Sequence, residues 1–224
     1  MENKIPKTIH YCWFGRWKKS EKIMKCIESW KKYCPDYEII EWNEDNFDVN
    51  INNYAKKYYH KKDWAFVADY ARMNVLFNHW WIYFDTDVEV IKNIDNLLFN
   101  EAFTWFQDKF SIWWAILWSK KWNKIIKEIL DYYETKKIKT ILPNLLNRIF
   151  KRHTNLKYCE NTQVIEWFSI YPKEYFYPYA YYERAQDMEI TNNTYTIHHY
   201  DATWLPKIVI IVLFPIIGYI SKYL

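Results

Sequence analysis

The chain has 224 residues, of which 50% are hydrophobic and 26% are charged, and its formal net charge is +4. This length and composition predict one compact domain with a sizeable core, and they exclude a disordered or collagen-like chain. The 31 basic and 27 acidic residues are mixed rather than gathered in a basic stripe, which argues against a nucleic-acid partner, and two glycines are too few for a Rossmann or P-loop nucleotide site.

Strands and helices are predicted to alternate through the first half of the chain. A strand over Thr8–Phe14 ends at Gly15, and the helix that follows begins after Ser20, its N-cap, and ends at Pro35. The remaining elements are a strand over 38–42, a helix over 66–77 and a strand over 82–84. This order predicts an α/β fold with a single open, mostly parallel sheet flanked by helices.

The second half gives weaker signals. A helix is predicted over Ile125–Tyr133, a Tyr- and Pro-rich loop over Tyr171–Tyr182, and the end of one more strand at Ile197–His199. Neither an internal repeat nor a linker interrupts this pattern.

The C-terminal end carries an apolar run over Ile208–Ile220, which is interrupted by Pro215 and Gly218. Thirteen residues are fewer than the ~20 that span a bilayer, so a transmembrane helix is not expected. The run is either a terminal segment buried against the core or, as we favour, a segment lying in the membrane interface. We therefore divide the chain into a domain over residues 1–204 and an apolar C-terminal segment over 205–224.

The sequence also indicates the compartment. The four cysteines form no C-x-x-C pair and show no metal-ligand spacing, which favours a reduced cytosolic chain over a disulfide scaffold. The first thirteen residues lack the apolar stretch of a signal peptide. We expect a cytoplasmic protein with a membrane surface among its partners.

Two carboxylates follow the predicted strand over Ile82–Phe84. Asp85 and Asp87 are two residues apart at the carboxyl end of that strand, where ligands bind in open α/β sheets. Such a pair can address one hard divalent cation, which prefers oxygen ligands and can carry a diphosphate. The alternative is an ordinary exposed acidic turn.

Two further clusters accompany this pair. Asp69 and Arg72 lie one helical turn apart and form either a plain salt bridge or a group that presents Arg72 to a phosphate or sugar. His198 and His199 are neighbours on a strand, so at most one of them faces a given site, as a further metal ligand or as a structural histidine.

Four segments together carry a family resemblance. They are I-P-K-T-I-H-Y-C-W-F-G at the start, A-F-V-A-D-Y-A-R, I-Y-F-D-T-D-V-E-V, and H-H-Y-D-A-T-W near the end. In this order and spacing, over about residues 5 to 204, they resemble the DXD-containing sugar transferases of glycosyltransferase family 32. That family includes bacterial capsular and lipopolysaccharide enzymes, and the catalytic domains of the clostridial glucosylating toxins are more distant relatives.

The resemblance implies a GT-A fold and a retaining transfer from a nucleotide-sugar, UDP-linked in our prediction, that depends on Mn²⁺ or Mg²⁺. It implies a glycan or lipid-linked acceptor in cell-surface polysaccharide synthesis, at the inner face of a bacterial cell membrane. By this resemblance, Trp13 matches the residue that stacks on the nucleobase, Asp69 the acid that contacts the nucleotide or sugar, and Arg72 the base beside the phosphate and sugar. Asp85 matches the acid near the ribose and metal, and Asp87 matches the direct metal ligand. His199, or His198 in its place, is a further metal-site residue, and Thr203 and Trp204 match the pair that closes over the diphosphate. Of these, Arg72, Asp85 and Asp87 are the predicted catalytic residues.

The sequence differs from the family pattern at several positions that are occupied by tryptophan. The family has Gly-Gly just before the DXD strand, where this chain has Trp80 and Trp81. Tryptophan also stands at other positions where small or turn residues are expected: Trp17, Trp105, Trp113, Trp114, Trp118 and Trp122. A bulky residue at a position of positive φ costs roughly 1 kcal/mol or more. We hypothesise that some of these eight tryptophans replace glycines, which places activity in question.

Two other functions compete with a transferase. In a phosphohydrolase of the haloacid dehalogenase type, Asp85 and Asp87 would be nucleophile and acid, but Glu89 stands where that family has Thr or Val. That reading also leaves Asp69 and Arg72 unexplained. The non-enzymatic alternative is a membrane-surface protein that binds a nucleotide-sugar without turning it over.

Overall fold

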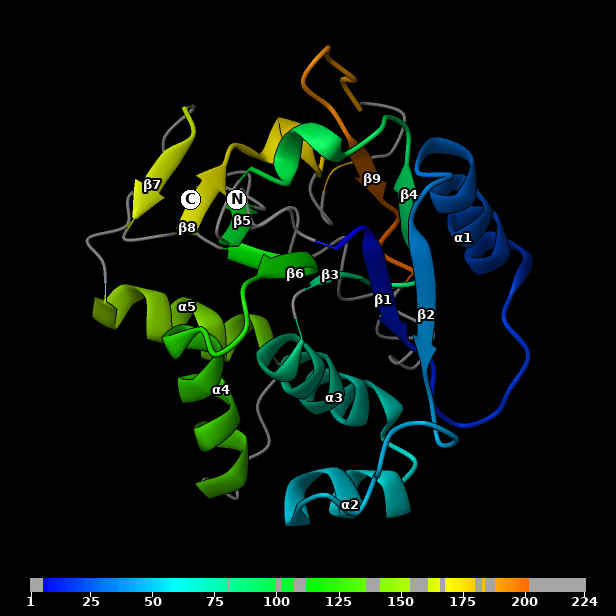
Figure 1. The fold of residues 1–224 in the computed structure, drawn as a ribbon, viewed down its shortest axis with the longest axis vertical. Coiled ribbons are helices and arrows are strands. Elements are labelled where there is room, and N and C mark those ends of the chain that lie inside the picture. Colours follow the sequence, from blue (N-terminus) through cyan, green and yellow to red (C-terminus); the bar gives the residue numbers. More distant parts are fainter. Residues whose placement is uncertain are drawn as a thin grey trace.

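The protein is described by a computed structural model that covers residues 6–79, 81–99, 102–106, 112–135, 142–153, 161–165, 168–179, 183 and 188–201. Its centre is a seven-stranded sheet in the order β2-β1-β3-β6-β5-β8-β7 (Figure 1). The strands of this sheet are β1 (Thr8–Cys12), β2 (Glu38–Trp42), β3 (Trp81–Phe84), β5 (Ala102–Phe106), β6 (Ile112–Ser119), β7 (Gln163–Ile165) and β8 (Phe168–Tyr171). Strands β2, β1, β3, β5 and β8 run in one direction, and β6 and β7 run against them. The predicted mostly parallel α/β sheet is therefore confirmed.

A second, two-stranded sheet was not predicted. It pairs β4 (Val88–Val90) with β9 (Thr196–His198) in antiparallel fashion. Val88 and Val90 are fully buried against the helix that follows β1, and this packing holds β4 outside the main sheet. The expected single sheet is thus a main sheet with a short ribbon beside the end of β3.

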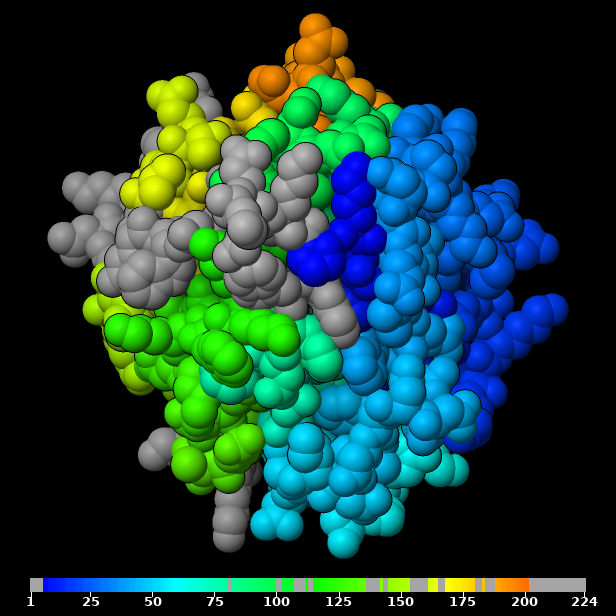
Figure 2. Space-filling view, viewed as in Figure 1, coloured from blue at the N-terminus to red at the C-terminus, as the bar shows by residue number. Residues whose placement is uncertain are grey.

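Helices cover both faces of the main sheet (Figure 1). The helices are α1 (Glu21–Tyr33), α2 (Asn53–His60), α3 (Trp64–Asn78), α4 (Lys124–Thr135) and α5 (Leu142–His153), with short 3₁₀ turns at Asp95–Leu97 and Lys173–Tyr175. The predicted N-cap of α1 is confirmed, because Ser20 Oγ accepts a hydrogen bond of 3.3 Å from the backbone N–H of Ile23. In the space-filling view the blue-to-cyan N-terminal part of the chain covers one side of the molecule, and the green and yellow middle part covers the other (Figure 2).

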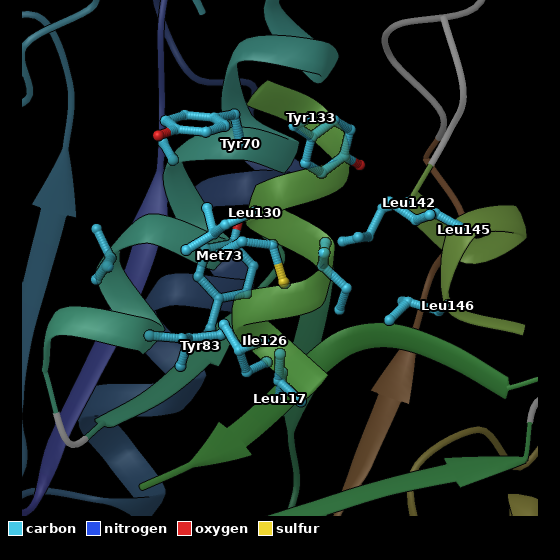
Figure 3. Close-up of a cluster of buried hydrophobic side chains, with 14 of the residues drawn as sticks. Tyr70, Met73, Tyr83, Leu117, Ile126, Leu130, Tyr133, Leu142, Leu145 and Leu146 are labelled. Atoms are coloured by element: carbon cyan, nitrogen blue, oxygen red, sulfur yellow. The ribbon is translucent and has the colours of Figure 1, made fainter. Parts of the chain in front are cut away.

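Strand alternation divides the interior into two cores. In β3, Tyr83 points to the core that α3, α4 and α5 cover, whereas Ile82 and Phe84 point to the core that α1 covers. Figure 3 shows the first of these cores, in which side chains of the helices and strands converge: Tyr70, Met73, Tyr83, Leu117, Ile126, Leu130, Tyr133, Leu142, Leu145 and Leu146. Because both faces of β3 are buried, the loop that follows the strand is held on a rigid base.

The tryptophans that stand where small or turn residues were expected lie in different environments in the structure. Trp105 and Trp118 lie in strands with fully buried side chains, so they occupy core positions in this structure. Trp122 is 71% exposed and has φ of 57°, a backbone state that favours glycine. Trp17 is 46% exposed. Residue 80 and the side chains of residues 81, 113 and 114 lie outside the described part of the chain.

Several predictions concern residues that the structure does not describe. These are Thr203, Trp204 and the apolar segment over 205–224, so the domain division and the interfacial segment stay predictions. Within the described residues, no helix combines the length and the hydropathy that crossing a membrane requires.

Candidate active site

Asp85 and Asp87 lie in the turn between β3 and β4. The backbone N–H of Asp85 donates to the carbonyl of Ala115 at 2.6 Å, and the N–H of Val88 donates back to the carbonyl of Asp85 at 3.2 Å. The first bond ties Asp85 to β6, and the second closes a tight turn, so that the two carboxylates lie close together at the carboxyl end of β3, as the sequence predicts.

His198 completes a three-residue cluster with the two aspartates. Ligand atoms of Asp85, Asp87 and His198 all lie within 4.8 Å of one another, and His198 Nε2 is 3.1 Å from Asp87 Oδ1. The pairing of β4 with β9 brings this about, because Val88 stands opposite His198 in the ladder. The imidazole is 4% exposed and stacks on the Tyr177 ring at a centroid distance of 4.9 Å.

His199, the histidine that the sequence analysis preferred for the metal, lies elsewhere. Its Nε2 is 2.9 Å from Glu89 Oε2, on the opposite face of β9, as strand alternation requires. The preference for His199 is therefore corrected in favour of its stated alternative, His198. The backbone of His199 still serves the site, because its N–H donates to the carbonyl of Asp87 at 3.0 Å.

The electrostatics of the cluster keep Asp87 ionised. Burial by itself would raise the pKa of Asp87, but the attraction of His198 and hydrogen bonds from His198 and the backbone N–H of Asp201 outweigh it and hold the pKa well below its usual range. Burial raises the pKa of Asp85, an effect that the charge of Arg72 opposes. The two carboxylates thus differ in environment although they belong to one turn.

Arg72 connects the helix α3 to this turn. Its Nη2 lies 2.9 Å from Asp85 Oδ1 and 3.2 Å from Asp69 Oδ1, and its guanidinium carbon is 4.6 Å from the centre of the Tyr83 ring. The predicted pair with Asp69 is present, but it is one half of a bridge that extends to the DXD turn. Burial raises the pKa of Asp69 to about 6, against the opposing charge of Arg72 and a hydrogen bond from the backbone N–H of Leu142.

Trp13 follows β1 at the same edge of the sheet, where its backbone N–H donates to the carbonyl of Trp42 at 2.8 Å. The indole is 9% exposed and stacks on Trp17, with ring centroids 4.9 Å apart and an angle of 20° between the planes. The predicted base-stacking residue therefore has an aromatic partner from its own chain.

Tyr177 is a site residue that the sequence analysis did not single out. Besides stacking on His198, its hydroxyl accepts a 3.1 Å hydrogen bond from the N–H of Ala115, the residue whose carbonyl anchors Asp85. The sequence shows a Tyr-rich stretch over residues 171–182 that contains this residue, but no feature of that stretch distinguishes Tyr177 from the neighbouring tyrosines.

Comparison with known proteins agrees with this geometry. Residues 20–104 match the model of the glycosyltransferase sugar-binding region containing a DXD motif, and residues 120–211 match that of the alpha 1,4-glycosyltransferase conserved region. Both models describe glycosyltransferases, and together they place the chain in this class of enzyme. Its family resemblance and its enzyme class are thus confirmed.

The fold of this glycosyltransferase is of the GT-A type. Among solved structures it is similar to the PaToxG glycosyltransferase, with 20% identity and a TM-score of 0.52 over 66% of this chain and 70% of that one. A glycosyltransferase involved in glycosylating the major capsid of PBCV-1 is also similar, with 13% identity and a TM-score of 0.43 over 75% and 83% of the two chains. No curated protein matches the sequence significantly.

Proposed function

We propose that this glycosyltransferase moves a sugar from a UDP-linked donor to a glycan or lipid-linked acceptor, with retention of configuration and with a divalent cation, Mn²⁺ or Mg²⁺, at Asp85, Asp87 and His198. The observation that carries the proposal is the cluster of these three side chains beside Arg72. A glycosyltransferase needs a sugar donor and an acceptor, and the carboxyl edge of the sheet is where such folds bind ligands.

The residues present fit such a cation. Two carboxylates and one imidazole are a donor set that Mn²⁺ accepts, and Mg²⁺ accepts the carboxylates. His198 Nδ1 is buried without a hydrogen-bond partner among the described residues, and the pKa of Asp87 is held well below its usual range, so Asp87 offers an ionised carboxylate to a cation.

A bound cation would supply a positive charge to the departing diphosphate. Arg72 brings a second positive charge to the same turn, and its bridge to Asp85 and Asp69 fixes the direction of the guanidinium. Asp69 orients Arg72 rather than acting as a free acid, since one of its oxygens faces Arg72 and the other accepts from a backbone N–H. Trp13 offers an indole face to the nucleobase.

We place the acceptor in bacterial cell-surface polysaccharide synthesis, capsular or lipopolysaccharide, at the inner face of the cell membrane. The family resemblance supports this placement, and so does the apolar C-terminal segment of the sequence. A haloacid dehalogenase type of phosphohydrolase is not favoured, because the Asp85–Asp87 pair is shared with His198 and Arg72 instead of standing alone.

A donor panel tests the proposal. UDP release from UDP-sugars at fixed Mn²⁺ is expected for the native protein and is expected to fall by a factor on the order of 100 or more in Asp87→Asn. Glu89→Gln is the matched control, because this carboxylate lies two residues along the chain and outside the cluster. Phosphate release from phosphomonoesters without UDP release would support the phosphohydrolase, and UDP-sugar binding without turnover would support the non-catalytic alternative.

A further inference from the structure

Trp17 covers the aromatic face that the proposed function gives to the nucleobase. The centroids of the Trp13 and Trp17 rings are 4.9 Å apart, and their planes are nearly parallel at 20°. A planar ring inserted between them would need about 7 Å, since carbon atoms in contact are about 3.5 Å apart on each side. A base and the Trp17 indole therefore exclude one another on that face of Trp13.

Lys19 also covers the Trp13 ring, and an ion pair with Glu41 holds it there. Lys19 Nζ lies 5.4 Å from the centre of the Trp13 ring and is held by Glu41, whose Oε2 is 2.7 Å away and also accepts from the Tyr11 hydroxyl at 2.5 Å. The Lys19 side chain is 18% exposed. Little of the Trp13 indole is open to solvent, so a base reaches it only if a covering group moves.

Of the two groups that cover the Trp13 indole, Trp17 is more exposed to solvent than Lys19. It is 46% exposed, whereas Trp13 is 9% exposed. Gly15 and Arg16 precede it with φ of 97° and 57°, and these two left-handed residues turn the chain back over Trp13. Two hydrogen bonds of 2.8 Å hold the turn closed: Trp17 Nε1 donates to the carbonyl of Phe14, and Trp13 Nε1 donates to the carbonyl of Trp17.

The turn itself stays anchored when Trp17 leaves. The N–H of Gly15 donates to Glu44 Oε1 at 2.7 Å, and a Cβ at residue 15 would come within 2.8 Å of the Trp64 ring. Arg16 forms an ion pair with Asp45 at the surface. The loop is thus held by contacts that do not involve the Trp17 side chain.

We propose that Trp17 is a nucleobase gate: in the donor-free protein its indole occupies the place of the base on Trp13, and it swings out when the nucleoside of the donor binds. The inference rests on the proposed function, in which Trp13 carries the base. Closed molecules cannot stack the base, so the apparent affinity for UDP is reduced by the closed fraction. The diphosphate and its cation bind at Asp85 and Asp87 and do not depend on the gate.

The test compares UDP with pyrophosphate, a diphosphate that lacks a nucleoside. Titration calorimetry at fixed Mn²⁺ on the full chain is expected to give UDP affinity about 2- to 13-fold higher in Trp17→Ala than in the native protein, the factor that corresponds to one aromatic pair. Pyrophosphate affinity is expected to be equal in both. Trp17→Phe, which keeps a ring on Trp13, is expected to lie between them. Trp122→Ala, another exposed tryptophan, is the control and is expected to leave both affinities unchanged.

Each other outcome overturns the gate. Equal or weaker UDP affinity in Trp17→Ala, with pyrophosphate bound as before, means that Trp17 is not in the way of the base, and the proposed function survives. Tighter binding of pyrophosphate as well as UDP means that the substitution acts on the whole site. Absence of UDP and pyrophosphate binding in all variants overturns the proposed function and the gate together.

Discussion

His198 Nε2 lies 3.1 Å from Asp87 Oδ1, although 111 positions separate the two residues in the chain. The antiparallel pairing of β4 with β9 makes this contact, and the N–H groups of His199 and Asp201 add bonds from the same segment to Asp87. The C-terminal part of the domain therefore supplies contacts that hold the DXD turn in its described geometry. Cation binding and the docking of β9 are expected to support one another.

His198→Ala is expected to weaken Mn²⁺ binding by more than the roughly 10- to 100-fold that the loss of an outer-shell partner costs, because a candidate ligand is removed. Titration calorimetry with Mn²⁺ measures this. His199→Ala is the matched control, since its imidazole lies with Glu89, and its Mn²⁺ affinity is expected to stay within about 3-fold of the native value. The reverse order of the two variants would restore His199 as the metal-site residue.

Arg72 is expected to matter through its forked geometry as well as its charge. Arg72→Lys keeps the charge but cannot reproduce the paired contacts of Nη1 and Nη2 with the two oxygens of Asp85, so kcat for UDP-sugar turnover is expected to fall by a factor on the order of 100. Arg72→Met removes the cation that faces the buried Asp69 and the partly buried Asp85, and it is expected to lower the free energy of unfolding by about 3 to 5 kcal/mol in denaturant titration. Native turnover in Arg72→Lys would show that the fork is dispensable.

Much of the fold follows from local patterns in the sequence. The helix over 66–77 and the strand over 82–84 were predicted because their apolar residues recur with the period of a helix or a strand, and both are present in α3 and β3. The ribbon of β4 and β9 was not predicted, because its strands are three residues each and lie more than 100 residues apart. Periodicity cannot report a pairing of that kind.

The site shows the same division. Asp85 and Asp87 could be predicted from the sequence, because they are two residues apart at the end of a predicted strand. The choice between His198 and His199 could not, because it depends on the register of β9 against β4. A shift of that register by one residue would exchange the two histidines. The contact of Trp13 with Trp17 was equally hidden, because it depends on the left-handed conformation of Gly15 and Arg16.

The acid stability of the protein is expected to depend on His10. This buried residue accepts a 2.8 Å hydrogen bond from Trp42 Nε1 at its Nδ1, and burial lowers its pKa to about 3. The unfolded chain binds a proton near pH 6.5, so the stability that neutral His10 contributes is present above that pH and is lost as the pH falls from 6.5 toward 3, by up to about 1.4 kcal/mol per pH unit.

His10→Asn isolates this contribution, because Asn keeps a hydrogen-bond acceptor and does not titrate. Asp69 changes the pH dependence of stability in the opposite direction, because its raised pKa gives stability at low pH that is lost as the pH rises through about 6. Asp69 is the same in both proteins and cancels in the difference. Denaturant titrations from pH 4 to 7 should show the native protein losing stability relative to His10→Asn as the pH falls. A constant difference would mean that His10 does not stay neutral.

Trp122 allows the hypothesis of replaced glycines to be tested at one described position. Its φ of 57° is costly for a residue with a Cβ, and its side chain is 71% exposed, so Trp122→Gly removes strain while giving up little packing. The free energy of unfolding is expected to rise by about 1 kcal/mol. Lys62→Gly is a matched variant, because Lys62 has the same φ of 57° and is expected to show a gain of the same sign.

Trp105→Gly is a control variant that is expected to lose stability rather than gain it. This tryptophan is fully buried in β5, so its removal leaves a cavity and is expected to lower the free energy of unfolding by about 3 to 5 kcal/mol. Thermal and denaturant unfolding of the three variants beside the native protein decides the matter. A loss of stability in Trp122→Gly together with a gain in Lys62→Gly would mean that the indole of Trp122 makes a favourable contact that outweighs the backbone strain, and the glycine hypothesis would then fail at this position.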